Sequence, residues 1–302
     1  MGTDTAASRQ RLAFVKGHGT GNDFVLLPDG AGPGGLTASL AASLCDRHTG
    51  LGGDGVLAVV EVAADPVARA LAAEVGDADA DGRVAAWFMD YRNADGSLAE
   101  MCGNGARVFA RHLLDSGRVA PGAFAILTRG GVRTVHAEAA GDVSVAMGRW
   151  HALGADVALV VGVGPRHWPA LGLAVPNPHA VAQVDDLAGV GDLAQPPSLS
   201  PAGTFPDGVN VEFVVDAGPG AIALRVHERG AGETLSCGTG AVAAAVATRL
   251  ARGEAVQAPR TTRVGVPGGS LTVREHPDRS TWLTGPAVLL AEGVVDALAL
   301  GG

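Results

Sequence analysis

The sequence predicts an α+β fold of two similar halves, each with one strong helix among short strands. Three observations support this fold class. Short apolar segments of strand length alternate with glycine-rich turns along the 302-residue chain. Only two segments have the periodicity of a strong central helix, which favours α+β over a doubly wound sheet. Cys-Gly-Asn-Gly-Ala at 102–106 and Cys-Gly-Thr-Gly-Ala at 237–241 precede these two segments, and this similarity indicates an internal repeat.

Strands and helices in the first half are bounded by glycine-rich turns. Residues 62–82 are rich in alanine and aspartate, and we interpret them as an insertion. The turn Asn93-Ala94-Asp95-Gly96 follows a strand. We expect strands at 12–15, 24–27, 56–60 and 87–93, and helices at 36–48 and 106–115, ending at Gly50 and Gly117.

The second half has the same kinds of segment in the same order. Asn177-Pro178-His179 lies between short apolar segments, and a proline-rich loop spans 191–208. We expect strands at 209–215 and 222–227, and an Ala/Val-rich helix at 241–251.

Four pairs of landmarks recur in order along the two halves. The two cysteine motifs, and also Asn93 and Glu228, are 135 residues apart, whereas the earlier pairs are about 155 apart. The insertion at 62–82 explains the change in spacing. We therefore predict two domains related by a pseudo-twofold axis, namely 1–146, completed by a C-terminal strand at 285–302, and 147–284. The earlier pairs are Asn22 with Asn177 and Asp54 with Asn210.

The basic residues exclude several classes of protein. There are 22 of them, and Lys16 is the only lysine. Lys16 is followed by Gly17, so the chain has no P-loop, and it is the only candidate for a pyridoxal phosphate Schiff base. The net charge of −9 and the lack of a basic run argue against binding to nucleic acid or to an anionic membrane.

The apolar and cysteine content favours a cytoplasmic protein. No run of about 18 apolar residues is present, and residues 1–10 contain no apolar segment typical of a signal peptide. Three cysteines do not make a disulfide scaffold, and the absence of Cys-x-x-Cys gives no indication of a zinc or thioredoxin-type site. We interpret Cys45, which no glycine turn follows, as a structural residue.

Cys102 and Cys237 are the strongest candidates for chemistry. A cytosolic cysteine is most often a small buried apolar residue. Each of these two, however, is followed by Gly-x-Gly-Ala and a helix, which predicts a thiol among free backbone N–H groups at a helix N-terminus. The positive end of the helix dipole would lower the thiol pKa and attract a carboxylate.

Two such thiols facing across a twofold axis would suit the inversion of a stereocentre. One thiolate would remove the α-proton from one face, and the opposite thiol would protonate the other face. A carbanion formed without an electron sink needs electrostatic stabilisation, which the two helix N-termini would give the carboxylate. The sequence therefore predicts a racemase or epimerase without a cofactor or metal.

At these motifs the sequence strongly resembles the diaminopimelate epimerase family, whose members interconvert LL- and meso-diaminopimelate without a cofactor. The resemblance implies two similar α+β domains, each with a central helix wrapped by mostly antiparallel strands, with the active site between them. It also implies a role in lysine and peptidoglycan-precursor synthesis, and homodimers are typical of the family. The matching segments span positions 16–240, namely 16–24, 46–55, 93–96, 100–107, 177–179, 208–210, 228–234 and 237–240.

The resemblance also assigns roles to individual residues. Cys102 and Cys237 would be the acid/base pair, supported by His179 and Glu228, which are suited to handling the thiol protons. The rest of the implied site would bind the substrate's ammonium, carboxylate and distal groups. These residues are Asn22, Asn93, Gly103, Asn104, Asn177, Asn210, Glu228, Arg229, Gly238 and Thr239.

Some alternatives stay open on the sequence alone. The enzyme could act on another amino acid with the same two thiols, or the scaffold could bind an amino acid without catalysis. Two matched thiols argue against the second option, and Glu228, Arg229 and the four asparagines favour a substrate with a second zwitterionic centre. Many family members have Gln where this chain has Gly55, which leaves one substrate contact open. The sequence also leaves open which cysteine is the resting thiolate.

Overall fold

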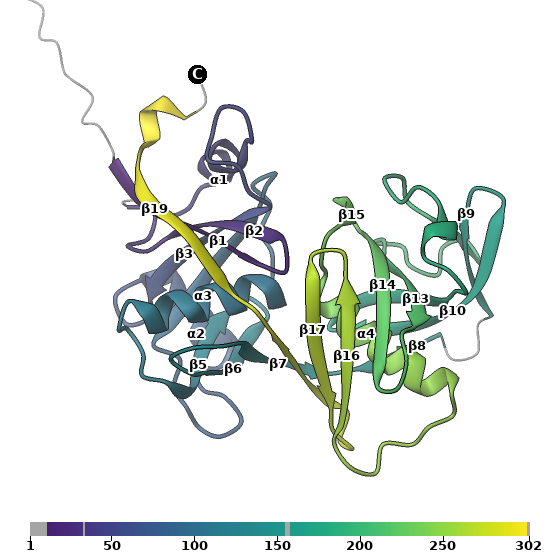
Figure 1. The fold of residues 1–302 in the computed structure, drawn as a ribbon. Helices are drawn as coiled ribbons and strands as arrows, with labels where there is room; N and C mark the ends of the chain where they lie inside the picture. Colours follow the sequence, from purple (N-terminus) through teal and green to yellow (C-terminus); the bar gives the residue numbers. More distant parts are fainter. Residues whose placement is uncertain (1–10, 33, 155–157, 301–302) are drawn as a thin grey trace, which may run out of the picture.

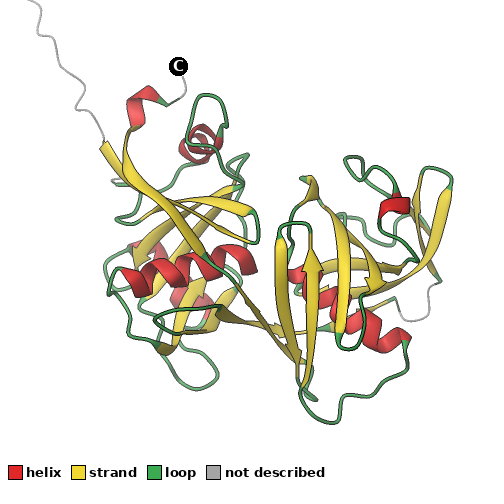
Figure 2. Ribbon diagram, viewed as in Figure 1, coloured by secondary structure: helices red, strands yellow, loops and turns green. Residues whose placement is uncertain are grey.

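The structure is a computed structural model that describes residues 11–32, 34–154 and 158–300. It has two lobes, and in each lobe strands surround one long helix (Figures 1 and 2). The described residues form 19 strands, four α-helices and two short 3-10 helices. The predicted α+β fold class is therefore confirmed.

The first lobe is built around α3. Two further helices lie at its surface, and one of them, α2, falls in the predicted insertion, where Asp65 accepts hydrogen bonds from two backbone N–H groups of its first turn. Its elements are β1 (Arg11–Gly19), β2 (Asn22–Leu27), α1 (Ala38–Cys45), β3 (Gly55–Glu61), α2 (Pro66–Val75), β4 (Trp87–Asn93), α3 (Gly103–Asp115), β5 (Gly122–Thr128), β6 (Gly131–Ala137) and β7 (Val143–Arg149).

The second lobe is built around α4. The segment 177–179, expected between strands, instead begins β11, and the loop at 191–208 contains the short strand β12. Its elements are β8 (His151–Leu153), β9 (Leu159–Val163), β10 (Arg166–Val175), β11 (Asn177–Gln183), η1 (Ala188–Val190), β12 (Ser198–Ser200), β13 (Asn210–Asp216), β14 (Ala221–Glu228), β15 (Gly232–Thr234), α4 (Gly238–Ala251), β16 (Arg260–Val266), β17 (Gly269–Glu275) and β18 (Ser280–Gly285).

Strands connect the two lobes, and the first turns of the two central helices meet at the boundary between them. β7 pairs antiparallel with β18, and β19 (Val288–Asp296) returns to the first lobe, where it pairs with β1 before η2 (Ala297–Ala299). The domain division at residues 146 and 284 stays a prediction. Residues 1–10, for which no signal peptide is expected, lie outside the described residues, as do 301–302.

Both central helices are buried almost along their whole length. Every residue from Gly103 to Leu114 in α3 and from Gly238 to Arg249 in α4 is buried. A helix enclosed on all sides needs small or apolar residues around its circumference, which explains the alanines and valines of α4. None of the helices in the described residues combines the length and the apolar character that crossing a bilayer requires.

Strand register confirms most of the internal repeat and corrects one pair. Phe24 of β2 lies beside Gly55 of β3, and His179 of β11 lies beside Asn210 of β13, both in parallel pairs. Asn210 therefore corresponds to Gly55, not to Asp54 as the sequence spacing suggested. The reason is that the repeat follows strand register. Phe24 and His179 are 155 residues apart, and Gly55 and Asn210 are separated by the same 155 residues.

Candidate active site

Cys102 and Cys237 are the N-cap residues of α3 and α4, as predicted. The Gly105 N–H donates to Cys102 Sγ at 3.4 Å, and the Gly240 N–H donates to Cys237 Sγ at 3.3 Å. Each thiol thus satisfies one of the N–H groups that a helix start leaves free. The helices begin at the glycine after each cysteine, three residues earlier than the periodicity predicted.

The first turns of the two helices meet at the boundary between the lobes. A Cβ added to Gly238 would lie 3.4 Å from the Gly103 Cα and 3.6 Å from the Asn104 N. Leu283 Cδ2 would lie 2.9 Å from a Cβ at either Gly103 or Gly238. The two glycines therefore allow the positive ends of two helix dipoles to converge on one place, which suits a carboxylate.

Asn22 and Asn104 lie beside Cys102. The Cys102 thiol donates to Asn22 Oδ1 at 3.7 Å, and Asn104 Nδ2 donates to the same oxygen at 3.2 Å. Asn104 Nδ2 also donates to the Ser236 carbonyl of the other lobe at 2.9 Å. Within the described part of the chain, the buried Asn104 Oδ1 has no hydrogen-bond partner and is free to receive a donor.

Cys237 lies among polar groups of the second lobe. Its Sγ is 3.4 Å from Thr239 Oγ1 and accepts from Asn210 Nδ2 at 3.9 Å. The Glu228 carboxylate accepts a hydrogen bond from Thr234 Oγ1 and contacts the Cys237 thiol. The structure thus brings Thr239, Asn210 and Glu228 to the second thiol.

Two predicted residues lie less directly at the thiols. Asn93 Oδ1 accepts from the Tyr91 hydroxyl at 2.9 Å, and its Nδ2 donates to Ser97 Oγ at 3.0 Å, so its amide is engaged within its own turn. Arg229 is exposed, and its guanidinium donates to the Asp207 carbonyl at 2.7 Å.

His179 and Asn177 belong to a polar group that includes a residue the sequence analysis missed. Glu212 Oε1 lies 2.7 Å from His179 Nδ1, and His179 Nε2 lies 3.0 Å from Asn177 Oδ1. Glu212 lies two positions after Asn210 in a strand, so it shares the inward face with Asn210. An acidic residue at an inward position, among valines and a phenylalanine, was the signal that could have revealed it.

Burial controls the acidity of both thiols and reverses one expectation. Although helix N–H groups contact them, burial raises the pKa of Cys102 to about 11, and burial together with the charges of Glu228 and Glu212 raises the pKa of Cys237 well above its usual value. The expected lowering of the thiol pKa is therefore wrong for this state, because desolvation outweighs the helix dipole. Burial also raises the pKa of Glu228, against hydrogen bonds from Thr234 and Cys237.

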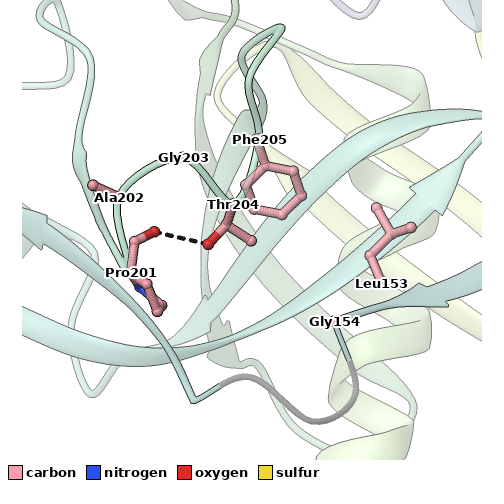
Figure 3. Close-up of a pocket in the computed structure, with 7 residues that line it drawn as sticks. All are labelled: Leu153, Gly154, Pro201, Ala202, Gly203, Thr204 and Phe205. Carbon is pink, nitrogen blue, oxygen red and sulfur yellow. Dashed lines mark hydrogen bonds between the residues drawn. The ribbon is translucent and has the colours of Figure 1, made fainter.

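The remaining surface features lie apart from the thiols. A hollow of about 510 Å³ in the second lobe is lined by residues 153–154 and 201–205, none of which is a predicted site residue (Figure 3). Thr204 Oγ1 donates to the Pro201 carbonyl at its edge.

Among residues 11–32, 34–154 and 158–300, no three His, Cys, Asp or Glu side chains are grouped to hold a metal. All three cysteines are free thiols.

Two lobes of one topology, each built around one buried helix, define a fold class that recurs in several solved structures. A hydroxyproline epimerase from Agrobacterium vitis has a TM-score of 0.64 at 17% identity, with 96% of this chain and 93% of that one covered. A Bacillus anthracis protein of the PhzF family has a TM-score of 0.63 at 12% identity, with 95% and 99% covered. These similarities concern the fold alone.

Sequence comparison identifies the family. The sequence model of diaminopimelate epimerase matches residues 14–153 and 173–290. A Streptomyces coelicolor diaminopimelate epimerase is 56% identical over 97% of this chain and 98% of its own length. A Mycobacterium tuberculosis diaminopimelate epimerase is 49% identical over 93% and 96%. The chain belongs to the diaminopimelate epimerase family.

Proposed function

We propose that this protein interconverts LL- and meso-diaminopimelate in lysine and peptidoglycan-precursor synthesis, with no cofactor, and that Cys102 and Cys237 exchange the α-proton. One observation carries this assignment. Two thiols cap two buried helices whose first turns touch, with a Cβ at Gly238 only 3.4 Å from the Gly103 Cα.

In the proposed reaction, one thiolate takes the α-proton and forms a thiol, while the opposite thiol protonates the other face and becomes a thiolate. The carboxylate of the carbanion would lie against the N–H groups of residues 103–104 and 238–239, where the helix dipoles stabilise its added charge. Such a preorganised donor is worth roughly 3–4 kcal/mol in a dry site.

The raised thiol pKa values make a proton acceptor necessary before the first step. Glu228 supports this role because its own pKa is raised by burial and because it contacts the Cys237 thiol. We propose that the Cys237 proton passes to the Glu228 carboxylate, leaving a thiolate and a carboxylic acid. His179 would support the same step from β11.

The rest of the proposed site would hold the substrate. Asn22, Asn104, Asn177 and Asn210 offer amides around the two thiols, and we propose that Asn93 and Arg229 turn from their present partners toward the distal centre. Free thiols agree with a reducing compartment, and we propose a cytoplasmic location. The homodimer that is typical of the family stays a prediction.

Incubation with LL-diaminopimelate in D₂O under reducing conditions tests this function. We expect deuterium at the α-carbon together with formation of the meso isomer, read by mass spectrometry and chiral chromatography. The absence of α-exchange would refute the function. Exchange into another amino acid but not into diaminopimelate would reassign the substrate.

A further inference from the structure

A buried contact between a carboxylate and a histidine ring lies beneath the second cysteine. Glu212 and His179 have fully buried side chains, and Glu212 Oε1 is 2.7 Å from His179 Nδ1. Among the described residues, the second carboxylate oxygen of Glu212 has no hydrogen-bond partner. Burying both charges costs free energy that their attraction does not always recover, so the pair calls for a functional explanation.

Strand geometry aims Glu212 at the start of α4. Glu212 follows Asn210 by two positions on β13, and His179 follows Asn177 by two on β11, so all four face the same side of the sheet. A Cβ at Gly240 would lie 2.6 Å from Glu212 Oε1, which places the carboxylate at the turn that Cys237 caps.

The first lobe fills the matching place with apolar side chains. Gly105, which corresponds to Gly240, would bring a Cβ within 3.3 Å of Leu57 and 3.4 Å of Phe24. By strand register, Leu57 and Phe24 occupy the positions of Glu212 and His179. The fold therefore closes beneath a cysteine-capped helix without an ion pair, and packing alone does not require one in the second lobe.

His179 lies between two oxygen acceptors. Its Nδ1 faces Glu212 Oε1, and its Nε2 lies 3.0 Å from Asn177 Oδ1. With Asn177 Oδ1 facing Nε2 and Glu212 Oε1 facing Nδ1, both ring nitrogens donate, which makes the ring a doubly protonated imidazolium. With Oδ1 bound to the ring, the Asn177 amide NH₂ is left for another acceptor.

We propose that Glu212 is a positioning residue that keeps His179 doubly protonated and so orients the Asn177 amide with its NH₂ group toward an oxygen of the substrate. This inference rests on the proposed function. If an amide replaces the carboxylate and its carbonyl accepts the Nδ1 proton, the neutral ring's Nε2 becomes an acceptor for Asn177 Nδ2. The amide would then turn its oxygen toward the substrate, which repels a carboxylate.

The other charged groups around the imidazole fit this role. Glu212, on β13, faces the His179 ring. Glu228 at the end of β14 and Cys237 at the start of α4 also belong to this cluster. A positive charge on His179 opposes the rise that burial causes in the pKa of Glu228. The imidazolium of His179 offsets the negative charges of Glu212 and Glu228. The Glu228 carboxylate therefore stays available to accept the Cys237 proton.

The decisive variant is Glu212→Gln, which keeps the shape and removes the charge. Nitrogen-15 NMR of histidine-labelled enzyme, with the His179 signal assigned by its loss in His179→Gln, reports ring protonation. We expect two protonated nitrogens in the wild type and one in Glu212→Gln. The KM for diaminopimelate should rise about 10- to 100-fold, as for loss of a hydrogen bond to a charged group, with a smaller change in kcat.

Two further variants keep the outcome interpretable. Glu212→Asp retains the charge and should restore the doubly protonated ring, whereas Leu57→Met disturbs the matching place in the first lobe and should leave His179 unchanged. A singly protonated His179 in the wild type would overturn the proposal even if Glu212→Gln failed to fold. An unchanged KM in a folded Glu212→Gln whose single ring proton lies on Nδ1 would also overturn it. Wild-type α-exchange in D₂O separately decides the proposed function.

Discussion

The Thr20 and Ser236 hydroxyl groups form a 2.6 Å hydrogen bond between the two lobes. Thr20 lies in the turn between β1 and β2, and Ser236 immediately precedes Cys237. Both hydroxyls are buried, and Arg107 donates to Thr20 Oγ1 at 3.3 Å. This hydrogen bond between residues far apart in sequence thus holds a turn of the first lobe beside the residue that precedes Cys237.

Thr20→Val should destabilise the protein by about 1–3 kcal/mol, because Ser236 and Arg107 lose a buried partner. Thr20→Ser keeps the hydroxyl and serves as the matched control. Urea unfolding of both variants measures the free energy of unfolding. Equal losses in the two variants would show that the hydroxyl contributes nothing.

Gly238→Ala should lower kcat/KM by about 100-fold, because the added Cβ would keep the carboxylate from the helix N–H groups, an effect comparable to losing one preorganised donor. Its Cβ would lie 2.9 Å from Leu283 Cδ2 and 3.4 Å from the Gly103 Cα, where the carboxylate is proposed to bind. Gly265→Ala is the control, since its nearest contact would be an ordinary 3.5 Å to Ala223. Steady-state kinetics with LL-diaminopimelate provide the measurement, and wild-type activity in Gly238→Ala would contradict this account.

Cys102→Ala and Cys237→Ala should each reduce epimerisation by about 1,000-fold, because each removes an acid/base group. Cys45→Ala should retain activity, since Cys45 is buried in α1 away from both helix starts. Chiral chromatography of the product distinguishes the three variants. An active Cys237→Ala enzyme would exclude the two-thiol mechanism.

Alkylation of Cys102 by iodoacetamide should be slow at pH 7 and accelerate about tenfold per pH unit below its pKa, because only the thiolate reacts. Burial raises this pKa to about 11, so the thiolate fraction grows as pH rises throughout the range from 7 to 10. Cys45 has the same raised pKa but is only 4% exposed, so it should react after Cys102. Peptide mass spectrometry follows both sites. A constant Cys102 rate from pH 7 to 10 would mean that the thiol is already ionised.

Gly55→Ala should destabilise the protein by about 1–3 kcal/mol through overpacking. Its Cβ would lie 2.6 Å from the Tyr91 ring and 2.7 Å from the Arg92 carbonyl. The Tyr91 ring therefore occupies the space that a side chain at position 55 would need. Chemical denaturation, with Gly265→Ala as the control, measures the loss. A Gly55→Ala protein as stable as the wild type would show that Tyr91 moves aside freely.

The sequence by itself determined the α+β class, the internal repeat and the two cysteine caps. These features depend on local chemistry. In Cys-Gly-x-Gly at a helix start, the thiol accepts from a backbone N–H group of the first turn, and the glycines let another group approach the backbone closely. Asn22, Asn104, Asn210, Glu228 and Thr239 could be placed near the thiols by motif. Their roles in binding stay predictions.

Only the tertiary structure decided the partners and the charges. The sequence pattern of β13 could mark Glu212 as a buried acid, but its contact with His179 could not be predicted, because that contact depends on the register of two parallel strands. The equivalence of Gly55 with Asn210 depends on the same kind of register. The thiol pKa depends on how completely distant segments exclude water, and that desolvation, absent from any local motif, outweighs the helix dipole.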